Sequence, residues 1–184
     1  MSYEFRNISV LVVESTRAMF DLTRSVLNTF GIEKIHSAYD SKTSFEKYCA
    51  YRPDLVIIDW LSPPDNSLEL IKRIRTDDAS PNPFVPIIMM TGFSQKRRVT
   101  DARDSGITEF LIKPFTAQTL YKRIERIIET PRQFVRAPGF VGPDRRRHRA
   151  DDFEGDEQRQ ERLKEERKAS DVARDIRNRG TKKD

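Results

Sequence analysis

The stretch DLVIIDWLSPP, residues 54–64, joins a buried strand to a carboxylate. Residues 55–58 are all apolar and rich in β-branched side chains, which is typical of a strand covered on both faces. Asp59 ends this run, and a tryptophan and two prolines follow shortly after it. Aspartate is common in turns, so Asp59 could simply begin one. The alternative is that the strand places a functional carboxylate at the edge of a sheet.

Composition divides the 184-residue chain into a body and a tail. Apolar segments alternate with turn signals up to about residue 141, whereas residues 144–184 are almost entirely charged. The net charge of +5 is shared between the two parts, and neither is basic enough to indicate DNA binding. The single cysteine, Cys49, fits a reducing compartment. Without an apolar run near 18 residues or a secretory signal, we expect a cytoplasmic protein with no membrane span.

Five apolar runs alternate with five helical patterns in the body. The predicted strands span residues 8–13, 34–38, 55–58, 85–92 and 109–113. Continuous apolar strands joined by helices predict a parallel sheet with both faces covered. Right-handed crossovers then favour an α/β fold of the (βα)5 type, a doubly wound, parallel, five-stranded sheet of the flavodoxin class. We therefore expect residues 1–130 to form one domain.

Chemically useful side chains end four of these strands, at Glu14-Ser15, Asp59, Thr91 and Lys113. Each alone has an ordinary explanation, but the carboxyl ends of parallel strands meet at one edge, where doubly wound sheets bind ligands. The chemistry that fits is phosphoryl acceptance, because a carboxylate such as Asp59 can form an acyl phosphate. Lys113 and a divalent cation would offset the transition-state charge, and the Thr91 hydroxyl would donate to a phosphoryl oxygen. Mg²⁺ suits such a site.

Four motifs resemble the receiver domain of bacterial two-component response regulators, the CheY-like fold. They are VLVVES (10–15), PDLVIIDW followed by two prolines (53–64), PIIMMTG (86–92) and FLIKPF (110–115). The resemblance covers about residues 8–129. It implies that Asp59 is the phospho-acceptor, Thr91 the hydroxyl that moves on activation, Lys113 the site lysine and Phe110 the aromatic switch. It also implies a cis bond before Pro114 and an output surface on residues 95–129 that bears Arg97, Arg98, Lys122 and Arg123.

The chain departs from this family pattern around the metal. Receivers usually carry two acidic residues after the first strand, whereas Glu14 is followed by Ser15, a poor magnesium ligand. The expected ligands are Glu14, Asp59 and the backbone carbonyl of Leu61, and losing one carboxylate weakens binding by about one to a few kcal/mol. Apolar Leu61 and Phe93 flank the site and could slow hydrolysis or mark a site that no longer turns over. The sequence DNS at 65–67 replaces the usual Asp-Gly turn.

Two segments follow the predicted domain. Residues 131–143 contain three prolines and two glycines, which predict a linker without regular structure, although its apolar Phe134, Phe140 and Val141 could pack on the body or on a partner. Residues 144–184 are predicted to be disordered or to form an exposed or marginal helix over 156–179.

An arginine cluster lies near the start of the tail and comprises Arg145, Arg146, Arg147 and Arg149. Solvated disorder is its simplest interpretation, and anion binding is the functional one. The spacing of Arg145 and Arg149 resembles the arginine pair with which PilZ domains bind cyclic di-GMP. It also resembles the arginine-rich tails of CheY-like proteins that bind this dinucleotide and act at the flagellar motor.

Two functional hypotheses follow. The first is a single-domain response regulator, not an enzyme in the usual sense, that takes a phosphoryl group from a histidine kinase or phosphotransferase and signals to a flagellar or kinase-related protein. The second is a degenerate receiver that acts as an adaptor or binds cyclic di-GMP through its arginines. Ser15 favours the second, whereas Asp59, Thr91 and Lys113 favour the first. No glycine-rich phosphate loop follows the first strand, which argues against a small enzyme on this fold.

Overall fold

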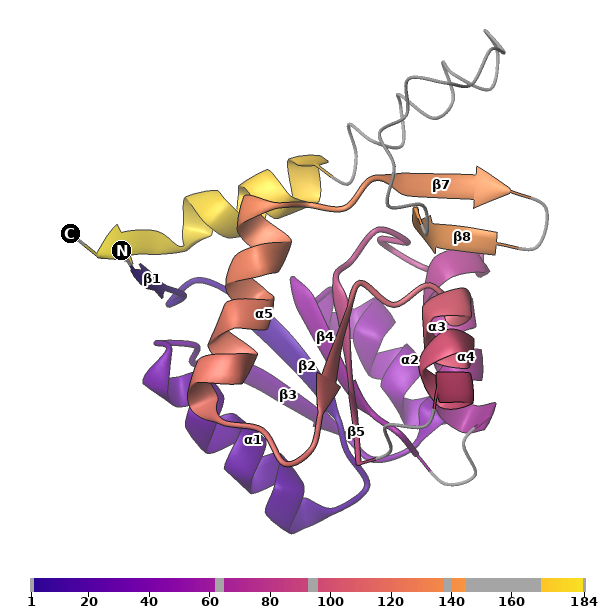
Figure 1. Ribbon diagram of the computed structural model, residues 1–184, viewed down its shortest axis with the longest axis horizontal. Coiled ribbons are helices and arrows are strands. Elements are labelled where there is room, and N and C mark those ends of the chain that lie inside the picture. Colours follow the sequence, from indigo (N-terminus) through magenta and orange to yellow (C-terminus); the bar gives the residue numbers. More distant parts are fainter. Residues whose placement is uncertain (1, 62–64, 93–95, 138–139, 145–169, 184) are drawn as a thin grey trace, which may run out of the picture.

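The computed structural model describes residues 2–61, 65–92, 96–137, 140–144 and 170–183 (Figure 1). Its centre is a parallel five-stranded sheet with the strand order β3-β2-β4-β5-β6. These strands are β2 (Ser9–Val13), β3 (Lys34–Ala38), β4 (Leu55–Asp59), β5 (Ile87–Thr91) and β6 (Glu109–Ile112). The doubly wound α/β fold predicted from the sequence is therefore confirmed.

Five helices cover the sheet, and they are α1 (Arg17–Thr29), α2 (Ser41–Tyr51), α3 (Asp65–Thr76), α4 (Lys96–Ser105) and α5 (Ala117–Glu129). Successive strand residues point to opposite faces, so Val10 and Val12 pack with α1 and α5, whereas Leu11 and Val13 pack with α2, α3 and α4. Both faces are buried, which explains why the strands are continuously apolar. None of the helices in the described ranges is long and apolar enough to span a membrane.

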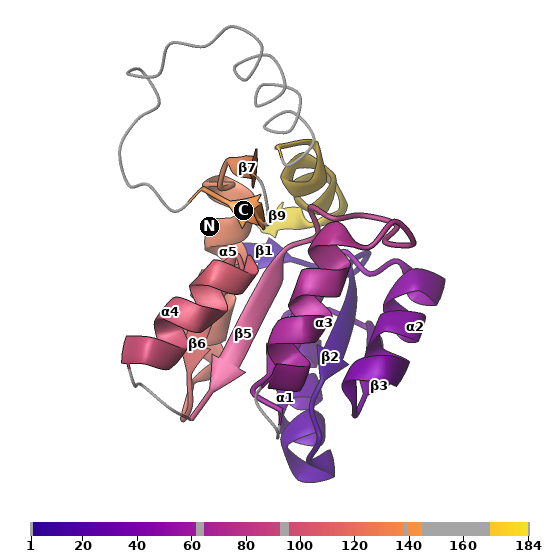
Figure 2. The same cartoon turned by 90° about the vertical axis from the view of Figure 1, so that its right-hand side faces the viewer.

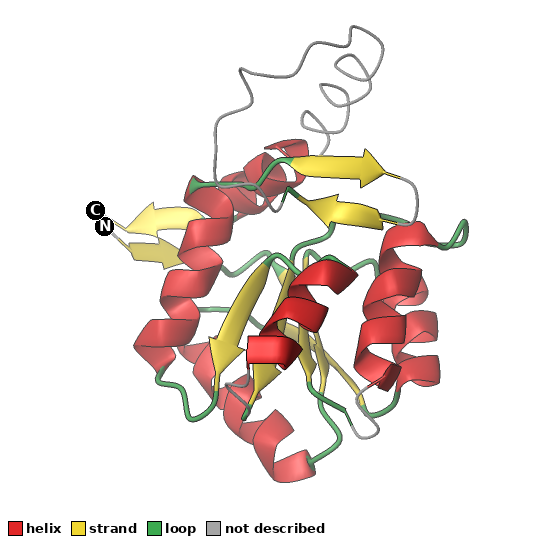
Figure 3. Ribbon diagram, turned by 45° about the vertical axis from the view of Figure 1, so that its right-hand side comes forward, coloured by secondary structure: helices red, strands yellow, loops and turns green. Residues whose placement is uncertain are grey.

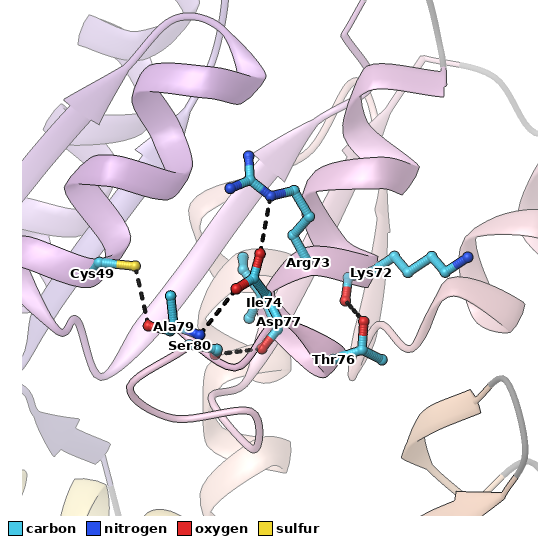
Figure 4. A network of polar contacts seen from close by, with 8 residues as sticks. All are labelled: Cys49, Lys72, Arg73, Ile74, Thr76, Asp77, Ala79 and Ser80. Atoms are coloured by element: carbon cyan, nitrogen blue, oxygen red, sulfur yellow. Dashed lines mark hydrogen bonds and ion pairs between the residues drawn. The ribbon is translucent and has the colours of Figure 1, made fainter.

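The end of α3 is closed by polar contacts with the chain that follows it (Figure 4). The Oδ1 atom of Asp77 accepts the N–H of Ala79 at 2.9 Å, and its Oδ2 atom lies 3.5 Å from Nε of Arg73. The Ser80 hydroxyl donates to the carbonyl of Ile74 at 2.6 Å. These bonds satisfy groups that a helix end leaves open, and they turn the chain toward β5.

The prediction of an irregular linker over residues 131–143 is wrong. Strands β7 (Phe134–Ala137) and β8 (Phe140–Pro143) pair antiparallel, with Phe134 opposite Pro143. The hairpin forms because its apolar side chains find partners on the body. The ring of Phe134 is buried with its centroid 5.4 Å from that of Phe84, and Val141 is also buried. Proline and glycine content alone could not show these tertiary contacts.

A buried arginine lies where the hairpin meets α3. Nε of Arg75 donates to the carbonyl of Gly106 at 2.9 Å, and Nη1 donates to the carbonyls of Pro83 and Val85 at 2.7 and 2.8 Å. Its guanidinium also lies 5.1 Å from the ring centroid of Phe134. Burial lowers the pKa of Arg75 to about 9. The bonds to three carbonyls compensate part of the cost of burying this charge.

The last described part of the tail is ordered and packs on the body. Residues 170–179 are helical, with Ala173 and Ile176 buried and Val172 partly buried against the core. Strand β9 (Thr181–Lys183) then pairs antiparallel with β1 (Ser2–Glu4), so the two chain ends lie side by side (Figure 3). The predicted helix is thus present at residues 170–179, but the prediction that it is exposed or marginal is wrong for this part. A short apolar stripe stabilises the helix through tertiary packing, which propensity does not measure.

Candidate functional site

The predicted site residues Glu14, Asp59 and Lys113 meet at the carboxyl edge of the sheet. This edge lies at the opposite pole from the β7–β8 hairpin and the C-terminal helix (Figure 2). Nζ of Lys113 lies 2.7 Å from Oδ1 of Asp59 and 3.1 Å from Oε2 of Glu14. The other oxygen of Glu14, Oε1, accepts the N–H of Thr16 at 2.8 Å. One ammonium group therefore bridges two carboxylates that come from different strands.

Backbone hydrogen bonds continue the sheet into this site. The N–H of Glu14 donates to the carbonyl of Ala38 at 3.0 Å, which extends the pairing of β2 with β3. The N–H of Lys113 donates to the carbonyl of Thr91 at 2.7 Å, which extends the pairing of β5 with β6. Thr91 is fully buried at the end of β5. The Lys113–Pro114 bond is cis, as the family resemblance implies.

The site is mostly buried, and its charges are unevenly balanced. The Glu14 side chain is 1% exposed, whereas those of Asp59 and Lys113 are 16% and 18% exposed. Burial raises the pKa of the Glu14 carboxyl, and repulsion from Asp59 adds to this, although the Thr16 hydrogen bond and the Lys113 charge oppose it. Two carboxylates and one ammonium leave a surplus of negative charge, which favours a further cation.

The residues present fit Mg²⁺. The carboxylates of Glu14 and Asp59 lie near each other, since one oxygen of each contacts the same ammonium group of Lys113. Mg²⁺ commonly binds through one or two carboxylates, with water and phosphate as its other ligands. Ser15 is exposed and adds no charge. Within the described ranges no three His, Cys, Asp or Glu side chains form a group that could hold a metal. The donor set therefore suits a magnesium ion with few protein ligands.

The start of α3 contains a residue whose role sequence reasoning missed. Ser67 belongs to the sequence DNS that replaces the family's usual Asp-Gly turn, and it is fully buried. Its Oγ accepts the N–H of Leu61 at 2.7 Å and donates to the carbonyl of Asp59 at 3.0 Å. The only signal in the sequence was a hydroxyl residue where the family turn usually has glycine.

The predicted switch and output residues lie on β6 and α5. Phe110 is half-buried against the core beneath α2, α3 and α4, and Ile112, two residues further along β6, is 49% exposed. Lys122 is exposed, whereas Arg123 forms an ion pair with Glu109 at 3.2 Å. The remaining predicted positions fall outside what the structure describes: the residues Phe93, Arg145, Arg146, Arg147 and Arg149, and the side chains of Arg97 and Arg98.

Comparison with known proteins decides the family. Residues 10–125 match the family described as the response regulator receiver domain. The chain belongs to this family. Helicobacter pylori chemotaxis protein CheY1 is 32% identical over 124 residues, which cover 67% of this chain and 98% of that protein. Vibrio cholerae chemotaxis protein CheY-3 is 27% identical over 124 residues, with coverages of 67% and 94%.

Solved structures agree on the fold of this receiver domain. The structure of Vibrio cholerae CheY4 superposes with a TM-score of 0.58 at 26% identity and covers 65% of this chain and 98% of that one. A putative response regulator from Chloroflexus aurantiacus gives a TM-score of 0.59 at 24% identity, with coverages of 65% and 96%. The family is one of signalling proteins, and receiver domains typically bind Mg²⁺ at the site of phosphorylation.

Proposed function

We propose that this receiver is phosphorylated on Asp59 by a histidine kinase or a histidine phosphotransferase and signals by protein–protein contact. The observation that carries the proposal is the 2.7 Å contact between Nζ of Lys113 and Oδ1 of Asp59. An ammonium group beside a partly exposed carboxylate at a strand end is the arrangement that phosphoryl transfer to Asp59 requires.

The transfer itself needs little covalent chemistry from the protein. An Oδ atom of Asp59 attacks the phosphorus of a phosphohistidine, and the P–N bond breaks as the P–O bond forms. Lys113 contacts the charge that develops on the phosphoryl oxygens, and the Thr91 hydroxyl lies on the neighbouring strand as a donor. Mg²⁺, held by Glu14, Asp59 and the carbonyl of Leu61, would supply further positive charge.

The signal then leaves through a surface made by α4, β6 and α5. Phe110 is half-buried on β6, the strand whose next residues lead to Lys113, so a change at the site can alter its packing. Exposed Ile112 and Lys122 give this surface both an apolar and a charged contact. The downstream partner is therefore a protein that binds this surface and responds to the state of Asp59.

Trp60 provides the test, because it directly follows Asp59 in the chain. Its fluorescence is followed during a titration with Mg²⁺ and then with beryllofluoride, a stand-in for the phosphoryl group. Acyl phosphate formed from acetyl phosphate is measured by mass spectrometry. We expect a saturable response that Asp59→Asn abolishes and that Asp78→Asn, at an exposed aspartate after α3, retains. A flat response together with no acyl phosphate would refute phosphorylation.

A second candidate function is a receiver that is not phosphorylated and acts as an adaptor or nucleotide-binding protein. The observation in its favour is Ser15, an exposed neutral residue where receivers usually hold a metal-binding acid. Its ligand would be cyclic di-GMP, bound through the arginine cluster at 145–149. Calorimetric titration of the full chain with this dinucleotide tests it. Saturable binding that is lost in Arg145→Ala with Arg149→Ala supports it, and no heat of binding refutes it.

A further inference from the structure

Ser67 makes contacts that the usual glycine of this turn could not make. Its side chain is fully buried at the start of α3. The Oγ atom accepts the N–H of Leu61 at 2.7 Å and donates to the carbonyl of Asp59 at 3.0 Å. A single hydroxyl therefore joins α3 to the backbone on both sides of Trp60.

These bonds hold the end of β4 in one arrangement. The N–H of Trp60 donates to the carbonyl of Met90 at 3.1 Å and continues the pairing of β4 with β5. With the two bonds to Ser67, three hydrogen bonds fix the main chain from Asp59 to Leu61. The Leu61 side chain is also buried, so its N–H would be left without a partner if the hydroxyl were removed.

We propose that Ser67 is a positioning residue for the phosphorylation site and tightens magnesium binding through Asp59 and Leu61. The proposal rests on the proposed function, since Asp59 and the Leu61 carbonyl are the ligands it orients. The second acidic residue is replaced by Ser15, so the site depends more on the fixed geometry of its remaining donors. Loss of a group that holds a metal ligand through a hydrogen bond commonly lowers the affinity for the metal by about 10- to 100-fold.

The chain offers a matched control in Thr108. Its buried hydroxyl also accepts a backbone N–H, that of Ile87 at 3.0 Å, but it does so at the amino end of β5. Thr108→Val and Ser67→Ala each remove one buried hydroxyl that accepts a backbone N–H. Both should therefore reduce resistance to urea, whereas only the Ser67 variant should alter the metal site.

The experiment measures the dissociation constant of Mg²⁺ by Trp60 fluorescence in the full-length chain, at a temperature where each variant is folded. Calorimetry of Mg²⁺ binding provides a second readout that does not depend on the tryptophan. We expect binding to weaken about tenfold or more in Ser67→Ala and to stay within about twofold in Thr108→Val. Ser67→Gly, which restores the usual turn residue, should weaken binding in the same way and serves if the alanine variant fails to fold.

Three results would overturn the proposal. Unchanged Mg²⁺ affinity in the Ser67 variants would show that the hydroxyl is only structural. An equal loss of affinity in Thr108→Val would show that the effect follows overall stability. A wild-type chain that binds neither Mg²⁺ nor beryllofluoride would refute the proposed function itself, and with it the role of Ser67.

Discussion

Nη2 of Arg179 lies 2.5 Å from Oδ1 of Asp54. Arg179 belongs to the C-terminal helix, whereas Asp54 directly precedes β4. The other oxygen of Asp54, Oδ2, accepts the N–H and the hydroxyl of Ser9 at 2.9 and 3.0 Å. The tail is thereby attached to the beginning of the strand that ends in Asp59. The receiver and the last part of the tail form one folded unit.

Replacing both partners of this ion pair should reveal a modest coupling. Arg179 is 43% exposed, so we expect a coupling free energy of about 0.2–1 kcal/mol in a double-mutant cycle of Arg179→Ala and Asp54→Asn. Asp54→Asn alone should cost more, because it also disturbs the bonds to Ser9. Urea unfolding of the four proteins measures this. Strictly additive effects would show that this ion pair does not help to hold the tail on the body.

Truncation of Ile176 tests the packing of the C-terminal helix. Its side chain is buried in the same cluster as Tyr3, Phe5 and the residues of α5. Ile176→Ala should therefore lower the free energy of unfolding by about 2–4 kcal/mol. Arg177→Ala, at an exposed position of the same helix, should change it by about 0.5 kcal/mol or less. Similar small effects for both variants in urea unfolding would contradict a docked helix.

A methyl group at Gly142 should disturb the β7–β8 hairpin. A Cβ atom there would come within 2.8 Å of the Cα atom of Gly106 and of the Phe140 ring. We expect Gly142→Ala to lower the thermal midpoint of unfolding by several degrees, since about 1–3 kcal/mol is typical of overpacking. Gly92→Ala is the control, because a Cβ at Gly92 has nothing within 4 Å. Equal midpoints would mean that the hairpin is not packed against the body.

Stability should depend on the protonation of His36. Its ring stacks on that of Tyr51 at 3.9 Å, and burial, with the nearby charge of Lys47 second, lowers the pKa of His36 below 6.5. The unfolded chain therefore takes up this proton first as the pH falls. Stability is complete above about pH 6.5 and decreases as the pH falls below it toward the pKa of the folded state. His36→Phe, which keeps an aromatic ring, should show a smaller decrease between about pH 7 and 5 in urea titrations.

Loss of the ammonium group at Lys113 should slow phosphorylation more than it affects folding. Removal of one group that stabilises transition-state charge typically costs about 10²–10³ in rate. We therefore expect Lys113→Met to form the acyl phosphate from acetyl phosphate at least about 100-fold more slowly. Lys122→Met, at an exposed lysine of α5, should react at the wild-type rate. An unchanged rate in Lys113→Met would assign the ion pair with Asp59 a structural role only.

The sequence by itself determined the five-stranded α/β body and most of the site. The apolar runs around Val10–Val13 and Leu55–Ile58 report burial on both faces, which is a local property of each strand. Because parallel strands end at a common edge, the positions of Glu14, Asp59 and Lys113 in the chain were enough to predict that they meet.

The tertiary structure decided the rest, because the remaining contacts join segments that are far apart in the chain. Phe134 forms part of a regular hairpin because its ring packs against the side chains of Phe84 and Arg75. The helix containing Ile176 is ordered because its few apolar residues reach a core built by the N-terminal strands and α5. The sequence around Ser67 indicates only a turn, and it is the folded chain that brings its hydroxyl to Asp59 and Leu61. Such contacts depend on where distant residues lie in space, which neither periodicity nor composition encodes.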